Sequence, residues 1–103
     1  MPFQIRLSEE AREDLQRLRK VDSARIIRDL QRMLSVTPTV ESKAVVKRLR
    51  QPAPTQYRLR VGDFRVFYNV GPNQVAVVRI LSKEQAAAYL EPEQDASSEG
   101  PAG

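Results

Sequence analysis

The stretch YRLRVGDFRVFY, residues Tyr57–Tyr68, predicts a β-hairpin and is the strongest structural signal in this sequence. Apolar and polar residues alternate on both sides of Gly62 and Asp63, and a two-residue loop with glycine is typical of a tight hairpin turn. Such a loop places Val61 opposite Phe64, which sets the register of every other pair in the hairpin.

This register divides the hairpin into an apolar face and a basic face, because side chains alternate between the two faces of a strand. We expect the apolar face to join the core; its members are Tyr57, Leu59, Val61, Phe64, Val66 and Tyr68. The other face pairs Arg60 with Arg65 and Arg58 with Phe67.

The Arg60–Arg65 pair is unfavourable, since like charges directly across a β-ladder cost from a few tenths to about 1 kcal/mol. A bound anion would remove the repulsion, and arginine is suited to bidentate recognition of phosphate. Alternatively, a nearby acid such as Asp63 or Glu84 neutralises the pair. The further basic residues around the hairpin favour phosphate recognition.

The composition restricts the classes of protein that remain. The 103 residues are enough for one domain, and 41% hydrophobic with 29% charged residues is typical of a soluble globular protein. No apolar run approaches the roughly 18 residues of a membrane span, and no signal-peptide pattern is present, so the cytoplasm is the expected location.

Cysteine and histidine are absent, which excludes disulfides, zinc-finger sites and histidine-based catalysis. We expect no cofactor and no metal.

Positive charge is concentrated in residues 1–90, which hold all 17 lysines and arginines, whereas residues 91–103 hold four acids and no base. Between Lys43 and Lys83 nine bases accompany one acid. Such a field suits RNA, DNA or an acidic protein partner, although a basic surface without a partner has the same composition. We therefore predict one domain over residues 1–90 and an acidic, disordered tail over residues 91–103.

The N-terminal part predicts a strand and two helices. Residues 3–7 alternate as in a half-buried strand, and Ser8 is expected to cap a helix. Asp22 or Ser23 is expected to cap a second helix, which Pro38 ends. The apolar stripes of the two helices are Ala11, Leu15 and Leu18, then Ile26, Ile27, Leu30, Met33 and Leu34. A short join makes the helices an antiparallel hairpin.

Residues 37–56 contain three prolines and give the weakest signal. Within them, residues 45–49 fit either a helical turn or a short extended piece.

Residues 75–81, VAVVRIL, predict a strand inside the sheet. Ser82 and Gln85 form a capping box for a helix over residues 83–90. The order β-α-α-β-β-β-α predicts an α+β fold, an antiparallel sheet packed against the N-terminal helical hairpin.

The chain resembles the RelE/ParE superfamily of bacterial type II toxin–antitoxin toxins. The most specific element is YRLRVGDFRVFY, which is similar to the tyrosine-arginine hairpin of that superfamily. The preceding helical hairpin and a last strand that leads to a Lys…Tyr segment agree with it. The resemblance covers residues 3–90 and implies a RelE-like fold.

The resemblance implies a metal-independent, ribosome-dependent endoribonuclease that cleaves mRNA and inhibits translation. Arginines would stabilise charge on the phosphorane formed when a ribose 2′-OH attacks the phosphate, and Tyr89 or a basic neighbour would move the proton. The implied catalytic residues are Arg58, Arg60, Arg65, Lys83 and Tyr89, and the predicted RNA-binding residues are Lys43, Lys47, Arg48, Arg50 and Arg79. Two departures from the family stand out: Lys83 replaces an arginine and so loses bidentate contact, and the segment ILSKEQAAAYL is unusually rich in alanine.

Two other functions remain open. One is a ParE-type toxin that inhibits DNA gyrase without nuclease activity, and the other is a non-toxic module that binds nucleic acid or an antitoxin. Either kind of toxin would bind a small antitoxin whose acidic and apolar side chains cover the basic face. The pair would also bind promoter DNA, and no membrane partner is expected.

Overall fold

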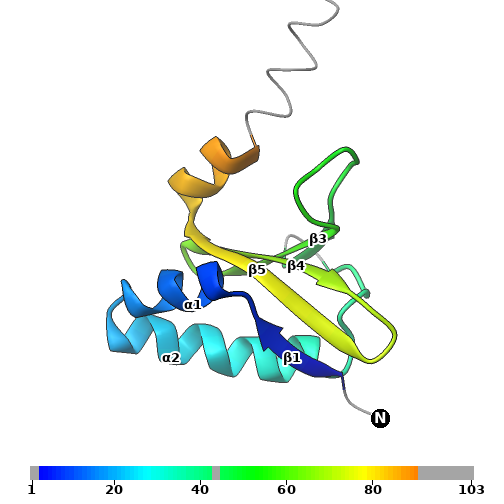
Figure 1. Cartoon of the computed structure of the whole chain (residues 1–103), viewed down its shortest axis with the longest axis horizontal. Coiled ribbons are helices and arrows are strands. Elements are labelled where there is room, and N and C mark those ends of the chain that lie inside the picture. Colours follow the sequence, from blue (N-terminus) through cyan, green and yellow to red (C-terminus); the bar gives the residue numbers. More distant parts are fainter. Residues whose placement is uncertain (1–2, 43–44, 91–103) are drawn as a thin grey trace, which may run out of the picture.

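One five-stranded sheet organises residues 3–42 and 45–90, the part of the chain that this computed structural model describes (Figure 1). The strands lie in the order β1-β5-β4-β3-β2. They are β1 (Gln4–Leu7), β2 (Val46–Arg48), β3 (Tyr57–Val61), β4 (Phe64–Val70) and β5 (Gln74–Ser82). The helices are α1 (Glu9–Gln16), α2 (Lys20–Asp29) with its π-helical continuation η1 (Leu30–Leu34), and a helix over residues 83–90. Lys43 and the predicted tail, residues 91–103, lie outside the described residues.

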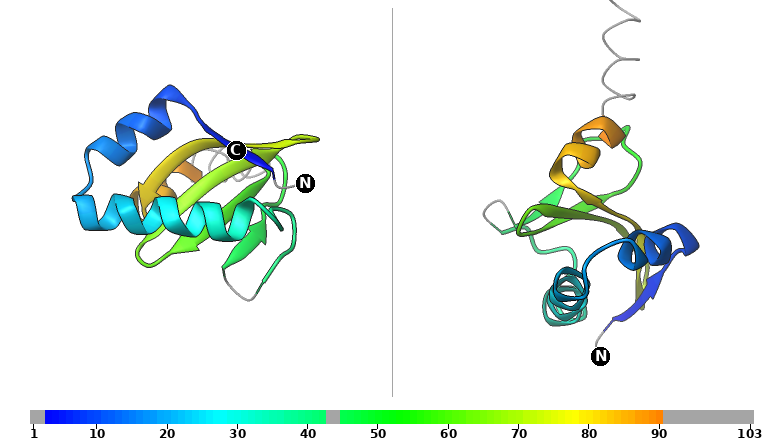
Figure 2. Two further views of the ribbon diagram at one scale, coloured as in Figure 1. Left: turned by 90° about the horizontal axis from the view of Figure 1, so that it is seen from below. Right: turned by 90° about the vertical axis from the view of Figure 1, so that its left-hand side faces the viewer.

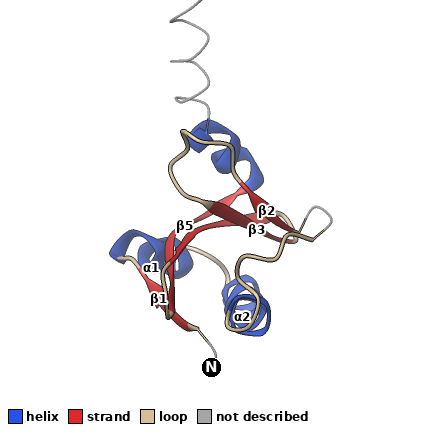
Figure 3. Cartoon of the chain, turned by 90° about the vertical axis from the view of Figure 1, so that its right-hand side faces the viewer, coloured by secondary structure: helices blue, strands red, loops and turns tan. Residues whose placement is uncertain are grey.

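Helices cover both faces of the sheet. Figures 2 and 3 show α1 and α2 on one side and the helix of residues 83–90 on the other. The larger core lies on the side of α1 and α2, and a smaller cluster of Phe67, Leu81 and Ala86 lies under the helix of residues 83–90. The predicted α+β class is confirmed. Among the described helices, none has the length and apolar character needed to cross a bilayer.

The β3–β4 hairpin has the predicted register, in which Tyr57 pairs with Tyr68 and Arg60 pairs with Arg65. Gly62 has a φ of 59°, in the left-handed region that the first position of this kind of turn requires. The predicted apolar face packs in the larger core, where the rings of Tyr57 and Tyr68 stack with their centres 5.5 Å apart.

One strand pairing differs from the predicted antiparallel sheet, and another decides between the two alternatives that the sequence left open for residues 45–49. β1 runs parallel to β5, so the sheet is mixed. The sequence allowed either a helical turn or a short extended piece over residues 45–49. In the structure this segment contains the strand β2, which pairs with β3 in antiparallel fashion. Both pairings join segments that are distant in the chain, and local residue patterns do not encode such contacts.

A β-bulge in β5 determines which face each of its side chains occupies. Phe67 of β4 pairs with Arg79, but the next β4 residue pairs with Val77, so Val78 is the extra residue. Without the bulge Arg79 would share the core face with Val77, because alternate residues of a strand point to the same side. The bulge places Ile80 in the core and Arg79 on the other face, and this explains how an arginine fits within a strand that is otherwise apolar.

The start of the second helix differs from the prediction. Neither Asp22 nor Ser23 caps it, because α2 already begins at Lys20 and its N-cap residue is Arg19. Asp22 lies in the first turn, where it accepts a hydrogen bond from Arg19 Nε at 3.2 Å, and a carboxylate there is favourable to the helix dipole. Ile27, expected on the apolar stripe, is exposed.

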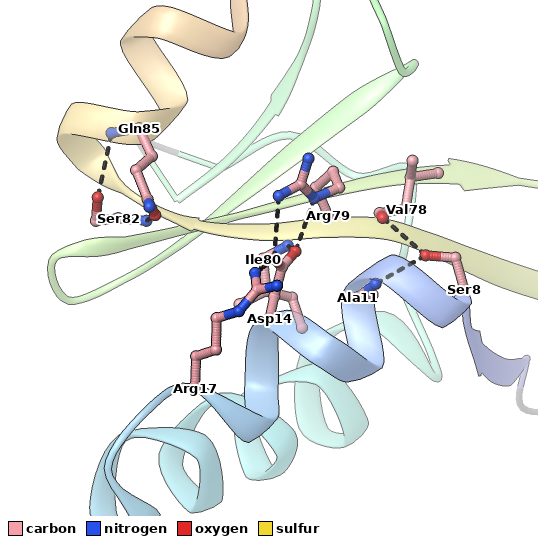
Figure 4. A network of polar contacts seen from close by, with 9 residues as sticks. All are labelled: Ser8, Ala11, Asp14, Arg17, Val78, Arg79, Ile80, Ser82 and Gln85. Atoms are coloured by element: carbon pink, nitrogen blue, oxygen red, sulfur yellow. Dashed lines mark hydrogen bonds and ion pairs between the residues drawn. The ribbon is translucent and has the colours of Figure 1, made fainter.

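α1 closes the half of β5 that β1 leaves unpaired (Figure 4). Ser8 caps α1 as predicted, since its Oγ accepts from Ala11 N, and its hydroxyl also donates to the Val78 carbonyl at 2.8 Å. Asp14 Oδ2 accepts from Ile80 N at 2.9 Å. These bonds satisfy strand-edge groups that would otherwise be buried without a partner.

Asp14 also forms a bidentate pair with Arg79. Arg79 Nε donates to Oδ2 at 2.8 Å and Nη2 donates to Oδ1 at 3.1 Å (Figure 4). Asp14 is only 5% exposed. One buried carboxylate therefore holds both the backbone and a side chain of β5 against α1.

Asp14→Asn should lower the free energy of unfolding by about 3 kcal/mol, because removing one partner of a buried ion pair leaves the other uncompensated. Chemical denaturation measures this change. Arg17→Gln is the matched control: Arg17 lies 3.7 Å from the same carboxylate, but its side chain is 70% exposed, so its loss should cost less than about 0.5 kcal/mol. Equal losses in the two variants would show that the Arg79 pair is worth no more than a surface contact.

Stability should also decrease at high pH because of Tyr68, whose hydroxyl donates to the Pro38 carbonyl at 2.7 Å. Burial, with a smaller contribution from Tyr57, raises the pKa of Tyr68 well above its usual value. A raised folded pKa gives stability that is complete below the unfolded pKa of about 10 and is lost as the pH rises toward the folded pKa. The free energy of unfolding should therefore fall above about pH 10, by up to about 1.4 kcal/mol per pH unit for this group. Tyr68→Phe should make the fall shallower, and an unchanged slope would contradict this assignment.

Candidate functional site

Basic residues form a row across the sheet on the face opposite α1 and α2. The pairing places Lys47 of β2 beside Arg58 of β3, Arg58 beside Phe67 of β4, and Phe67 beside Arg79 of β5. A second row on the same face joins Arg60 and Arg65 to Leu81. Directly paired residues point to the same side of a sheet, so five basic side chains project from this face.

Three arginines on this face, Arg58, Arg60 and Arg65, are called the arginine trio, and two of them lie close enough to Arg58 to affect its pKa. Burial lowers the pKa of Arg58, and the positive charges of Arg65 and then Arg60 lower it further. Arg65 Nη1 donates to the carbonyls of Gly62 and Phe64, at 3.2 and 3.0 Å. The buried Nε of Arg58 has no hydrogen-bond partner.

The arginine trio is not neutralised by acidic residues of the described chain. Within residues 3–42 and 45–90, no carboxylate lies within 4.0 Å of a guanidinium nitrogen of the trio. Neither Asp63 nor Glu84 therefore forms an ion pair that would neutralise Arg60 and Arg65. The trio is a concentrated, partly desolvated positive charge, which is the environment that an anion stabilises.

The helix of residues 83–90 borders this face and is held at its beginning. Ser82 and Gln85 form the predicted capping box, with Gln85 N donating to Ser82 Oγ and Ser82 N donating to Gln85 Oε1, both at 3.1 Å (Figure 4). Lys83 N donates to the Asp63 carbonyl at 2.9 Å, which ties the helix to the hairpin turn. The Lys83 side chain is exposed.

Tyr89 packs at the far end of this helix between an aromatic ring and a cation. Its ring meets Phe67 edge-on with centroids 5.0 Å apart, and the Arg79 guanidinium carbon lies 5.8 Å from the ring centre. Burial raises the pKa of Tyr89, which outweighs the lowering effect of Arg79. Tyr89 is therefore protonated at neutral pH and is suited to donate a proton rather than to accept one.

The predicted RNA-binding residues lie in different parts of the molecule and have different contacts. Lys47 lies beside the trio, and Arg79 is paired with Asp14. Arg48 belongs to the other face, where its guanidinium lies 5.6 Å from the Tyr57 ring centre and Nη1 donates to the Tyr57 hydroxyl at 3.2 Å.

Arg50 is exposed in the loop between β2 and β3. This loop rises on the same side of the sheet as the helix of residues 83–90 (Figures 1 and 3). Its first residue, Leu49, packs against the cluster of Phe67, Leu81 and Ala86. Arg50 is thus on a segment anchored near the trio.

Asp14 is a residue of the candidate site that the sequence analysis did not predict. It contacts Arg79, which in turn lies over Tyr89. A signal was present: Ala11, Asp14 and Leu15 have the i, i+3, i+4 spacing of one helix face. An acid inside an apolar stripe predicts a buried cationic partner.

Comparison with known proteins supports a shared family and fold. Residues 5–87 match the family model described as the ParE toxin of the type II toxin-antitoxin system parDE. No curated protein sequence matches the chain.

Solved structures with the same fold come from several microorganisms. The RelBE2 toxin-antitoxin complex from Mycobacterium tuberculosis contains a chain with 25% identity and a TM-score of 0.65, covering 80% of this chain and 99% of the other. The RelE-RelB complex from Pyrococcus horikoshii OT3 has 23% identity, a TM-score of 0.65, and coverage of 81% and 97%. A mutant of the E. coli toxin RelE in the free state has 18% identity, a TM-score of 0.67, and coverage of 86% and 92%.

Arg60→Gln should stabilise the free protein and weaken its response to anions. Removing one member of the Arg60–Arg65 pair relieves a repulsion worth about 0.5 kcal/mol at low salt. High salt screens this repulsion, so the gain in stability should disappear there. Added polyphosphate should raise the melting temperature of the original protein more than that of the variant, as thermal unfolding would show. Arg28→Gln is the control, since Arg28 is exposed on α2 and remote from this face. An Arg60→Gln variant less stable than the original protein would contradict the repulsive pair.

Proposed function

The chain belongs to the ParE toxin family of type II toxin–antitoxin systems, within the RelE/ParE superfamily, and we propose that it is an endoribonuclease that cleaves mRNA on the ribosome. Such cleavage inhibits translation. The observation that carries the proposal is the arginine trio, three adjacent cations with no carboxylate partner among the described residues.

The trio supports phosphate binding. Arg60 and Arg65 are directly paired across the hairpin, so their side chains start from neighbouring positions on one face, and their guanidinium groups would share a phosphate between them. Arg58 adds a partly desolvated charge, which interacts with an anion more strongly than an exposed charge does. Lys47, Lys83 and Arg50 would contact neighbouring phosphates of the same strand.

Cleavage would proceed by attack of a ribose 2′-OH on the adjacent phosphorus, with departure of the 5′ oxygen of the next nucleotide. The arginine trio would stabilise the charge that develops on the phosphorane oxygens. Tyr89, protonated at neutral pH, would donate its proton to the departing 5′ oxygen. The 2′-OH proton would pass to a phosphate oxygen, since the neighbouring side chains are cationic.

The partner that we propose is a small antitoxin. The Mycobacterium tuberculosis chain that shares 25% identity was solved in a toxin-antitoxin complex. An antitoxin segment with acidic side chains would neutralise the trio and restore the favourable electrostatics that the free protein lacks. The complex would also bind promoter DNA.

A second candidate function is inhibition of DNA gyrase without cleavage of RNA. The match to a family model described as the ParE toxin favours it, and so does the alanine-rich helix, in which Lys83 offers one point charge where an arginine would give two parallel bonds. In this alternative the basic face would bind its target and Tyr89 would have only a packing role.

Primer-extension mapping of mRNA after a pulse of expression tests the proposed function. Arg65→Ala and Tyr89→Phe should each reduce cleavage by about 100-fold or more and relieve growth arrest, because one removes charge stabilisation and the other the proton donor. Tyr89→Phe keeps the ring that packs on Phe67, so it separates chemistry from folding. Arg28→Ala, an exposed arginine on the opposite side, is the matched control and should cleave normally.

Two results would contradict the nuclease, and a third would contradict the proposed partner. If Tyr89→Phe leaves growth arrest intact while gyrase supercoiling activity falls, the gyrase function is correct. If expression without any antitoxin leaves growth unaffected, the chain is a non-toxic binding module. If a co-expressed neighbouring antitoxin forms no complex with this chain, the proposed partner is wrong.

A further inference from the structure

A continuous chain of side-chain contacts runs from α1 through β5 to the helix of residues 83–90. Asp14 of α1 holds Arg79 of β5 by two hydrogen bonds, at 2.8 and 3.1 Å. The Arg79 guanidinium lies over the ring of Tyr89 at 5.8 Å, and this ring meets Phe67 at 5.0 Å. The first residue of this chain of contacts, Asp14, is buried, and the last, Phe67, belongs to the smaller core cluster.

We propose that Asp14 is a positioning residue for the candidate site, because its carboxylate fixes the Arg79 guanidinium over the Tyr89 ring and so holds Tyr89 on the face of the arginine trio. This inference rests on the proposed function for its effect on cleavage. The positioning of Tyr89 by Asp14 can be tested without it.

The geometry of the pair explains why a carboxylate is needed. Two parallel hydrogen bonds fix the plane of a guanidinium, whereas one bond leaves it free to rotate. Asp14 is itself fixed, because Oδ2 also accepts from Ile80 N at 2.9 Å. The Arg79 side chain is 27% exposed, and a cation at this depth without a partner would turn toward water and leave the ring.

The contact with Arg79 adds to the apolar packing at the end of this helix, where Tyr89 and Leu90 pack against the cluster of Phe67, Leu81 and Ala86. The capping box and the Lys83–Asp63 bond act at the beginning of the helix. At the end, Tyr89 and Leu90 are only half-buried. A cation over an aromatic ring is attracted to the face of the ring, so the Arg79 contact helps to keep this turn docked against Phe67.

Besides burial, which raises the pKa of the Tyr89 phenol most, charged groups from two elements act on it. Arg79 on β5 lowers its pKa, while Glu10 and Asp14 on α1 raise it. Asp14→Asn would therefore change the pKa both directly, by removing a negative charge, and indirectly, by releasing Arg79. A double-substitution cycle separates the two effects, because only the indirect effect depends on Arg79.

The experiment is NMR titration of tyrosine labelled with ¹³C at the ring carbon that bears oxygen, with the Tyr89 signal assigned by its absence in Tyr89→Phe. Arg79→Met should raise the pKa of Tyr89, and the shift should largely vanish in the Asp14→Asn background. Arg17→Gln is the control, since Arg17 lies 3.7 Å from Asp14 but has no contact with Tyr89, and it should leave the signal unchanged. An Arg79→Met shift of equal size in both backgrounds would overturn the proposal.

Cleavage kinetics give the second measurement. Asp14→Asn and Arg79→Lys should each lower kcat on the order of tenfold by misplacing the proton donor, with KM nearly unchanged because the trio is intact. Arg79→Lys keeps the charge but loses the two parallel bonds, and it decides the question if Asp14→Asn does not fold. An Arg79→Lys variant with normal kcat and normal Tyr89 titration would overturn the proposal. A wild-type chain that cleaves no RNA would refute the proposed function alone, since the titration cycle would still test the positioning.

Discussion

The buried carboxylate of Asp14 connects parts of the molecule that are otherwise independent. β1 pairs with only the first half of β5, so the second half needs another partner for its edge. Asp14 supplies an acceptor for Ile80 N and a partner for Arg79. An acid can be this deeply buried only when its charge and lone pairs are satisfied. The contacts of Asp14 consequently link the position of α1, the edge of β5 and the docking of the helix of residues 83–90.

The β-bulge at Val78 makes this connection possible. In a regular strand Arg79 would enter the core beside Val77, where its charge would have no partner. The extra residue turns Arg79 to the face of the helix formed by residues 83–90, within reach of both Asp14 and Tyr89. A local irregularity of one residue thus separates an apolar core from a basic face, and bulges are frequent next to functional sites for this reason.

The two faces of the β3–β4 hairpin have opposite effects on stability. The apolar face packs in the larger core and stabilises the fold. The other face carries Arg58, Arg60 and Arg65, and burial together with the charges of Arg65 and Arg60 lowers the pKa of Arg58. Charged groups with perturbed pKa values are concentrated at functional sites, although they also occur in structural networks. The arginine trio is therefore the feature on which the proposed binding of an anionic partner rests.

The sequence by itself determined the hairpin, its register, the caps at Ser8 and Ser82 and the α+β class, because each depends on residues that are near one another in the chain. Only the tertiary structure decided the parallel pairing of β1, the strand character of β2 and the bulge that orients Arg79, since these depend on contacts between distant segments. The candidate site likewise has one part that the sequence predicts and another part that only the tertiary structure reveals. The arginine trio follows from alternation along two adjacent strands, whereas Asp14 and Arg79 meet across 65 residues of sequence. Local periodicity encodes which face a side chain occupies, but only the folded chain determines which distant side chain it meets.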